Sequence, residues 1–219
     1  MSVDNALKWI DGRGWLVLSA SPTFDSEIRA LTLARAKAMG GVAYIGLDVD
    51  DAEDALEDMS ELGAPTGYLV NIMTEDGETI HKRLTECSVV IIPGDYPVDA
   101  LINALKGAAI DALKDAFERG VVILAESRSA SVFGKIVSLY SGRMIDGLNW
   151  VEDAVIIPDI LSITDSEDAR VALETKTVKV AVGLGSGSAL VLGPSNLIEI
   201  WGEKHVTIGF GHTNENDAK

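Results

Sequence analysis

The segment from Val121 to Gly134, VVILAESRSASVFG, constrains the fold more than any other part of the chain. The apolar run Val121 to Leu124 has strand character, and the small residues around Ser127 permit a tight turn before a segment that can continue as a helix. A strand, a sharp turn and a helix with serine at the apex are typical of a nucleophile elbow, which holds the serine hydroxyl above a sheet. The sequence therefore predicts a sheet of buried strands, with Ser127 as the candidate nucleophile.

Apolar strand-like runs alternate with helical patterns from the first strand to this elbow. Such alternation implies right-handed crossovers and a parallel sheet that helices cover on both faces. The predicted fold class is α/β, a three-layer sandwich with a mostly parallel central sheet. Strands are expected at 15–19, 42–47, 68–72 and 89–92, and helices at 25–39, 80–86 and 108–119.

The last third of the chain has short apolar runs broken by Gly or Pro turns, which predict antiparallel hairpins at the C-terminal edge of the sheet. The glycine-rich stretch 183–187 leads into another strand, so it is interpreted as a turn and not as a nucleotide-binding loop. Residues 1–212 are expected to form a single domain and 213–219 a disordered tail. The expected strands are 155–157, 177–182, 189–192, 197–201 and 205–208.

Composition narrows the classes of partner and compartment. The 219 residues carry a net charge of −16, which disfavours nucleic acid and anionic lipid as partners. Cys87 is the only cysteine, so an internal disulfide is excluded and a buried core position is expected. No signal-like or membrane-spanning run occurs, which predicts a cytoplasmic protein. The acidic stretch 48–61 has Glu53 where a calcium loop needs glycine, so neither a metal nor a cofactor is expected.

The order of elements, the elbow and the hairpin-rich end resemble the cyanophycinase and aspartyl dipeptidase family of serine peptidases, whose fold is related to class I glutamine amidotransferases. Residues 121–132 align without a gap with the family pattern V-V-V-A-G-T-S-A-G-A-A-V, which places Ser127 on the nucleophile. Pro93-Gly94-Asp95 matches the G-G-D turn on the oxyanion side, and residues 182–192 match the stretch G-I-D-E-D-T-A-L-V-V. The resemblance covers roughly residues 14–210 and implies a Ser-His-acid triad.

The chain departs from this pattern at the residue that would act as the catalytic base. The family histidine lies in a D-Q-H-F type segment after the elbow helix, where this chain reads Ile157-Pro158-Asp159-Ile160, so Asp159 takes the histidine position. His81 and His205 are expected on the surface, and His212 begins the tail, from which it could fold back over the sheet. A serine hydroxyl needs a base to accept its proton, so the triad is predicted to be broken.

The turn on the oxyanion side and the residue after the elbow serine differ from the family pattern as well. Pro93 removes one backbone donor from the oxyanion turn, which leaves the N–H groups of Gly94 and Arg128. The resemblance predicts alanine where Arg128 stands. Arg128 is expected either to bind an anionic ligand or to pair with Glu126 or Asp159.

Three hypotheses follow. The favoured one is a noncatalytic relative whose pocket near Ser127, Arg128, Asp95 and Asp159 binds a small molecule or peptide. The second is an active serine hydrolase with a rearranged base, either Asp159 or a histidine from the tail or a partner subunit. The third is an assembly subunit whose contact surface includes Trp9, Trp15, Trp150 and Trp201, although packing in the core or at the sheet edge is preferred for these tryptophans. Under all three hypotheses a homo-oligomer is expected, most simply a dimer.

Overall fold

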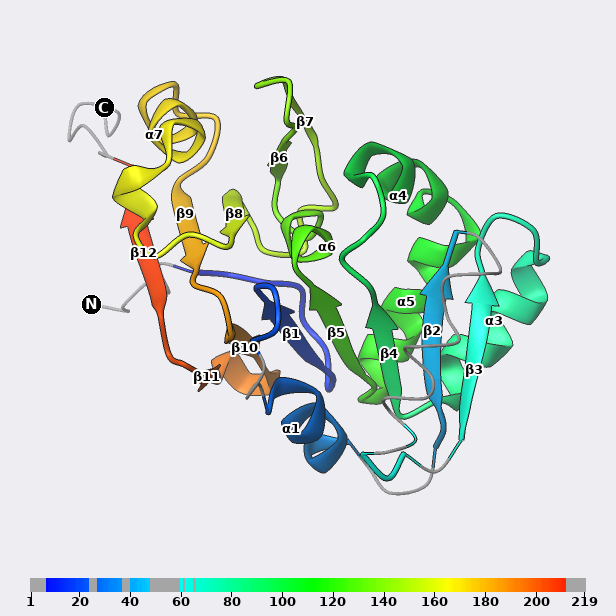
Figure 1. Cartoon of the computed structure of the whole chain (residues 1–219). Helices are drawn as coiled ribbons and strands as arrows, with labels where there is room; N and C mark the ends of the chain where they lie inside the picture. The colour runs from blue at the N-terminus through cyan, green and yellow to red at the C-terminus, as the bar shows by residue number, and fades with distance from the viewer. Residues whose placement is uncertain are drawn as a thin grey trace.

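The computed structural model describes residues 7–23, 27–36, 40–47, 60, 62–64 and 66–211, which form two sheets with helices around them (Figure 1). In spatial order, the seven-stranded sheet contains β11 (Ile198–Gly202), β10 (Ser188–Leu192), β1 (Trp15–Ser19), β5 (Val122–Glu126), β4 (Val89–Ile92), β2 (Val42–Gly46) and β3 (Gly67–Asn71). The five-stranded sheet contains β12 (Val206–Phe210), β9 (Val180–Leu184), β8 (Ala154–Pro158), β6 (Ile136–Ser138) and β7 (Met144–Asp146). The helices are α1 (Ile28–Arg35), α3 (Gly77–Glu86), α4 (Val98–Leu105), α5 (Ala108–Arg119), α6 (Arg128–Ser131) and α7 (Glu167–Glu174), with 3-10 turns at Ile163–Asp165 and Pro194–Asn196.

The large sheet is parallel at its centre. β1, β5, β4, β2 and β3 all run in the same direction, whereas β10 is antiparallel to β1 and β11 is antiparallel to β10. All four residues of β4 are buried, as expected for a continuous apolar run that helices cover on both sides. The predicted α/β class, with a mostly parallel central sheet and an antiparallel edge pair near the C-terminus, is confirmed.

The alternation of side chains along each strand divides the core between the two faces of this sheet. Leu16 and Ile123 face a cluster that includes Leu84 of α3 and Phe117 of α5. Val17 and Leu124, next to them in the chain, face the other cluster, to which α1 contributes Ile28. Helices therefore cover both faces, which gives the three expected layers (Figure 1).

The second sheet was not expected. The sequence placed every late strand at the edge of one sheet, but only β10 and β11 lie there, while β12 pairs with β9, and β9 and β6 flank β8. Periodicity identifies a buried strand without indicating the edge to which it pairs, so the prediction was wrong on this point. The three-residue strands β6 and β7 and the helices α4 and α7 were not predicted either.

Local signals at the helix ends explain why α3 and α5 begin and end where they do. The Asp76 side chain accepts hydrogen bonds from the N–H groups of Glu78 and Thr79, both at 3.0 Å, and so caps the first turn of α3. Gly120 ends α5 with φ of 101°, a left-handed conformation that glycine adopts at low cost. The helices predicted at 80–86 and 108–119 are thus confirmed, the first of them extended by three residues at its start.

The tryptophans pack mainly inside the protein. Trp150 is only 1% exposed and contacts the rings of Phe133 and Phe117 at centroid distances of 5.2 and 5.7 Å. Trp201 is also buried, and the Arg35 guanidinium lies 4.1 Å from the ring centroid of half-buried Trp15. Trp150 and Trp201 therefore cannot contribute to a contact surface as the third hypothesis required. Among the residues described, no helix has the length and apolar character needed to cross a bilayer.

Cys87 is buried as expected, and burial raises the pKa of its thiol from 9.0 to about 12. Burial also raises the pKa of the Tyr68 phenol, to about 12. Between pH 9 and 12 the folded chain keeps a thiol proton that the unfolded chain releases, so stability should fall as pH rises. For this one group the slope is on the order of 1 kcal/mol per pH unit. Urea unfolding at pH 8, 10 and 11 should show this decline, and Cys87→Ala should reduce it; an unchanged slope in the variant would contradict the assignment.

Candidate functional site

Ser127 stands at the turn between β5 and α6, as the sequence predicted. Its φ of 49° and ψ of −127° lie outside the regions that residues with a Cβ usually occupy. Such a conformation costs of order 1–3 kcal/mol and persists only where the surrounding structure enforces it. The chain therefore has the backbone of a nucleophile elbow, with the serine at its apex.

The register of the two sheets brings three loops to this elbow, those after β1, β8 and β9. Ser19, the last residue of β1, is paired with Glu126 at the end of β5, so the loop after β1 reaches Ser127. In the other sheet, Pro158 at the end of β8 is paired with Leu184 at the end of β9. The residues that follow these strands meet where the sheets adjoin, which is the usual place for a binding site in folds with parallel strands.

Three residues from these loops surround the Asp159 carboxylate with hydrogen-bond donors. Oδ1 accepts from the Ser21 N–H at 2.9 Å and from the Ser186 hydroxyl at 3.2 Å. Oδ2 accepts from the Ser21 hydroxyl at 2.8 Å and lies 3.4 Å from the Ser127 hydroxyl oxygen. Three donors therefore hold this carboxylate, two from Ser21 and one from Ser186, and Ser127 lies at the limit of hydrogen-bond range.

The Ser127 hydroxyl lies closer to Ser21 than to Asp159, with 3.0 Å between the two serine oxygens. Ser21 has a single hydroxyl proton and donates it to Asp159 at 2.8 Å, so Ser127 is the donor in the contact between the serines. This gives a Ser127–Ser21–Asp159 relay in which the carboxylate is the final acceptor. Asp159 is thus linked to the elbow serine mainly through Ser21.

Glu126, just before the elbow, has a different partner from those considered in the sequence. Its carboxylate forms a bidentate ion pair with Arg29 of α1, with both N–O distances 2.8 Å, and its side chain is only 7% exposed. Arg128 does not pair with Glu126. Its guanidinium instead lies 5.1 Å from the ring centroid of exposed Tyr140.

The turn on the oxyanion side does lie against the elbow. A Cβ at Gly94 would come within 2.5 Å of the Ser127 Cβ, so only glycine permits this approach. The Ser129 hydroxyl donates to the carbonyl of Pro93, which further fixes the two turns together. Asp95 is exposed and is not among the residues that line the adjacent cavity. The roles of Gly94 and Arg128 as oxyanion donors stay predictions.

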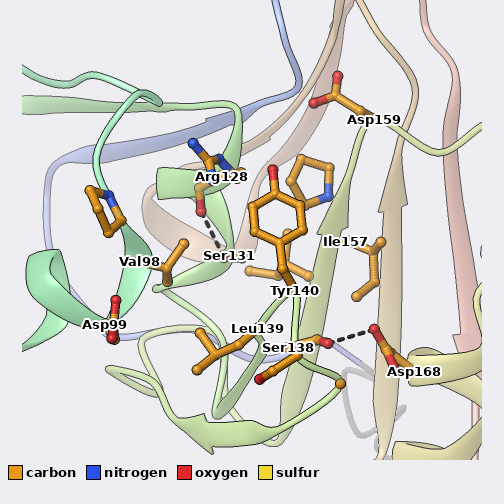
Figure 2. A pocket seen from close by; sticks show the side chains of 15 residues that line it. Val98, Asp99, Arg128, Ser131, Ser138, Leu139, Tyr140, Ile157, Asp159 and Asp168 are labelled. Carbon is orange, nitrogen blue, oxygen red and sulfur yellow. Dashed lines mark hydrogen bonds between the residues drawn. The ribbon is translucent and has the colours of Figure 1, made fainter.

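A cavity of about 920 Å³ opens beside the elbow (Figure 2). Figure 2 shows Arg128 and Asp159 at one end and the hydrogen-bonded pair Ser138 and Asp168 toward the other, with Tyr140 between them. Its size is in the range of pockets that enclose small ligands. The lining residues are Pro97, Val98, Asp99, Arg128, Ser131, Ser138, Leu139, Tyr140, Ser141, Gly142, Ile156, Ile157, Pro158, Asp159 and Asp168.

The described histidines lie on other parts of the chain. His81 of α3 is hydrogen-bonded through Nε2 to Asp115 of α5 at 2.7 Å. His205 is exposed in the turn between β11 and β12, where its backbone contacts Gly185 and Ser188. His212 lies outside the described residues. The hydrogen-bond partners of the Ser127 hydroxyl within the described ranges are thus Ser21 and Asp159, and no imidazole is among them.

Metal ligation finds no support in the part of the chain that the structure describes, where no group of three or more His, Cys, Asp or Glu residues could hold an ion. Most of the acidic stretch 48–61 lies outside the described ranges. Residues 183 and 184 complete β9, and residues 185–187 form the turn to β10 that was predicted in place of a nucleotide-binding loop. This turn supplies Ser186 to the carboxylate of Asp159.

Sequence reasoning missed Ser21, Arg29 and Tyr140. Ser21 follows the carboxyl end of a correctly predicted strand, which is a known signal for a site residue in parallel sheets. That signal becomes specific only once β1 is known to lie beside β5. Arg29 and Tyr140 carry no comparable signal, because an arginine on a helix and a tyrosine in a turn are ordinary surface residues.

Comparisons with known proteins support the fold. No protein-family model and no curated protein matches the chain. Among solved structures, a peptidase from an acI-B1 actinobacterium is similar, with a TM-score of 0.67 and 14% identity over 87% of this chain and 88% of that chain. A putative peptidase E protein from Listeria monocytogenes EGD-e gives a TM-score of 0.62 and 14% identity over 87% of this chain and 99% of that chain. At this identity the similarity shows the fold alone, and the chain has a peptidase E-like fold.

Proposed function

We propose that the chain is a noncatalytic relative of the peptidases that share this fold, and that it binds a small ligand in the cavity beside Ser127. The observation that carries the proposal is the set of partners around the Ser127 hydroxyl. Ser21 is the nearest partner, and the carboxylate beyond it already accepts from Ser21 and Ser186. The elbow thus keeps its serine, and no imidazole of the described residues stands in the position of a base.

A carboxylate is a poor substitute for that imidazole. A carboxylate is a much weaker base than an imidazole, so it removes a proton from a serine hydroxyl less efficiently. The relay through Ser21 adds a second hydroxyl that would have to give up its own proton.

One observation favours the alternative, an active serine hydrolase with a rearranged base. Ser127 keeps the strained backbone of an elbow, with φ of 49°, although nothing in a merely structural turn requires that strain. In this alternative Asp159, acting through Ser21, would accept the Ser127 proton. The alternative and the favoured proposal differ in whether Ser127 reacts with an acylating or phosphonylating reagent.

A fluorophosphonate probe separates the two. We expect the purified protein to show no labelling above that of Ser127→Ala during an hour at neutral pH, measured by intact-protein mass spectrometry, because no base activates the hydroxyl. A matched serine hydrolase in the same buffer controls for probe quality. Stoichiometric labelling that Ser127→Ala abolishes would overturn the noncatalytic proposal and support the hydrolase.

The third hypothesis loses its original support, since two of the four tryptophans lie in the core. The homodimer stays a prediction. Edge strands β11 and β12 expose Ile198, Ile200 and Phe210, which offer apolar area that a second copy would bury.

A further inference from the structure

The charged side chains that line the cavity differ in their hydrogen-bond and ion-pair partners. Asp159 accepts three hydrogen bonds, Asp168 accepts one from the Ser138 hydroxyl, and Asp99 accepts one from a backbone N–H. Among the described residues that line the cavity, Arg128 alone carries a positive charge. Its guanidinium stacks on Tyr140, and no carboxylate of the described residues forms an ion pair with it. A planar guanidinium with unused donors at the rim of a cavity is suited to bind a carboxylate in a bidentate manner.

The walls of the same cavity are mainly apolar. Val98 from the start of α4, Leu139 just after β6 and Ile157 from β8 converge on it (Figure 2). Pro97 and Pro158 extend this surface without adding side-chain donors. A polar ligand would leave these walls poorly matched, whereas an apolar group displaces water from them favourably.

We propose that the cavity binds a carboxylate joined to an apolar body, with the carboxylate on the Arg128 guanidinium and the body between Val98, Leu139 and Ile157. This rests on the proposed function, because it names the ligand class of the same cavity. Two sources have this chemistry: a free apolar acid and the C-terminus of a short apolar peptide. The Ser127 hydroxyl next to Arg128 is not needed for either to bind.

The test uses isothermal titration calorimetry on the full chain with matched ligands. Octanoate and 1-octanol differ only at the head group, as do the dipeptide Leu-Phe and its C-terminal amide. We expect each carboxylate to bind at least about tenfold more tightly than its neutral match, since hydrogen bonds to charged groups contribute that much. Arg128→Gln should remove this preference and leave octanol binding unchanged, whereas Leu139→Ser should weaken octanoate and octanol alike.

Arg119→Gln is the charge-matched control, because it removes one positive charge from the exposed last turn of α5, which does not line the cavity. If Arg128→Gln binds octanoate as tightly as the wild type does, the ligand class is wrong although ligand binding stands. If none of the four ligands binds, both the ligand class and the proposed function fail. Tighter binding of Leu-Phe than of octanoate assigns a peptide terminus, and the reverse order assigns a free acid.

Discussion

Replacing Asp159 by histidine should raise the rate of Ser127 labelling by a fluorophosphonate about 10²-fold, the lower end of what a positioned general base contributes. A carboxylate oxygen of Asp159 lies 3.4 Å from the Ser127 hydroxyl oxygen, and the resemblance predicts the histidine at this residue. Its φ of 59° is one that histidine tolerates better than most residues do. The rate is measured by mass spectrometry as labelled fraction against time.

Two control variants decide the meaning of that result. Asp159→Asn keeps the shape of the side chain but supplies no base, so it should label no faster than the wild type. Asp159→His combined with Ser127→Ala should not label at all. If Asp159→His labels no faster than Asp159→Asn while both remain folded by circular dichroism, then the lack of an imidazole does not explain the low reactivity of Ser127. The next residue to substitute would then be Pro93, which removes a backbone donor from the oxyanion turn.

The second large effect is expected on stability. Arg29→Met should lower the free energy of unfolding by about 3–5 kcal/mol, because it leaves the Glu126 carboxylate buried with neither of its bidentate hydrogen bonds. Glu126 directly precedes Ser127 in β5, so this pair fixes the strand end from which the elbow departs. Urea unfolding at neutral pH, followed by circular dichroism, measures the change.

A double variant and an exposed ion pair serve as controls. Adding Glu126→Gln to Arg29→Met removes the unpaired charge and should restore part of the lost stability. Arg170→Met breaks ion pairs with Glu167 and Glu174 on the exposed face of α7 and should change stability little. An equal loss of unfolding free energy in Arg29→Met and Arg170→Met would show that the Arg29–Glu126 pair stabilises the fold no more than an exposed ion pair does.

Much of the fold could be read from the sequence because its signals are local. The strands at 15–19 and 89–92 and the helix at 108–119 were predicted with the bounds that the structure has. Each is a run whose apolar spacing matches one period and which ends at a glycine or a polar turn. The elements that were missed are short: β6 and β7 have three residues each, and α4 has only eight, although its buried residues 98, 101, 102 and 105 have helical spacing.

The features of the candidate site also separate into those set by local sequence and those set by tertiary contacts. The sequence by itself determined that residue 127 is a serine at a strand–turn–helix apex and that the residue after Pro158 is an aspartate, since both depend on neighbouring residues. Only the tertiary structure decided that Ser21 lies between them, that Glu126 pairs with Arg29, and that late strands form a second sheet. These contacts join residues about 100 positions apart, and strand register and sheet order, which bring them together, are set by packing of the whole chain.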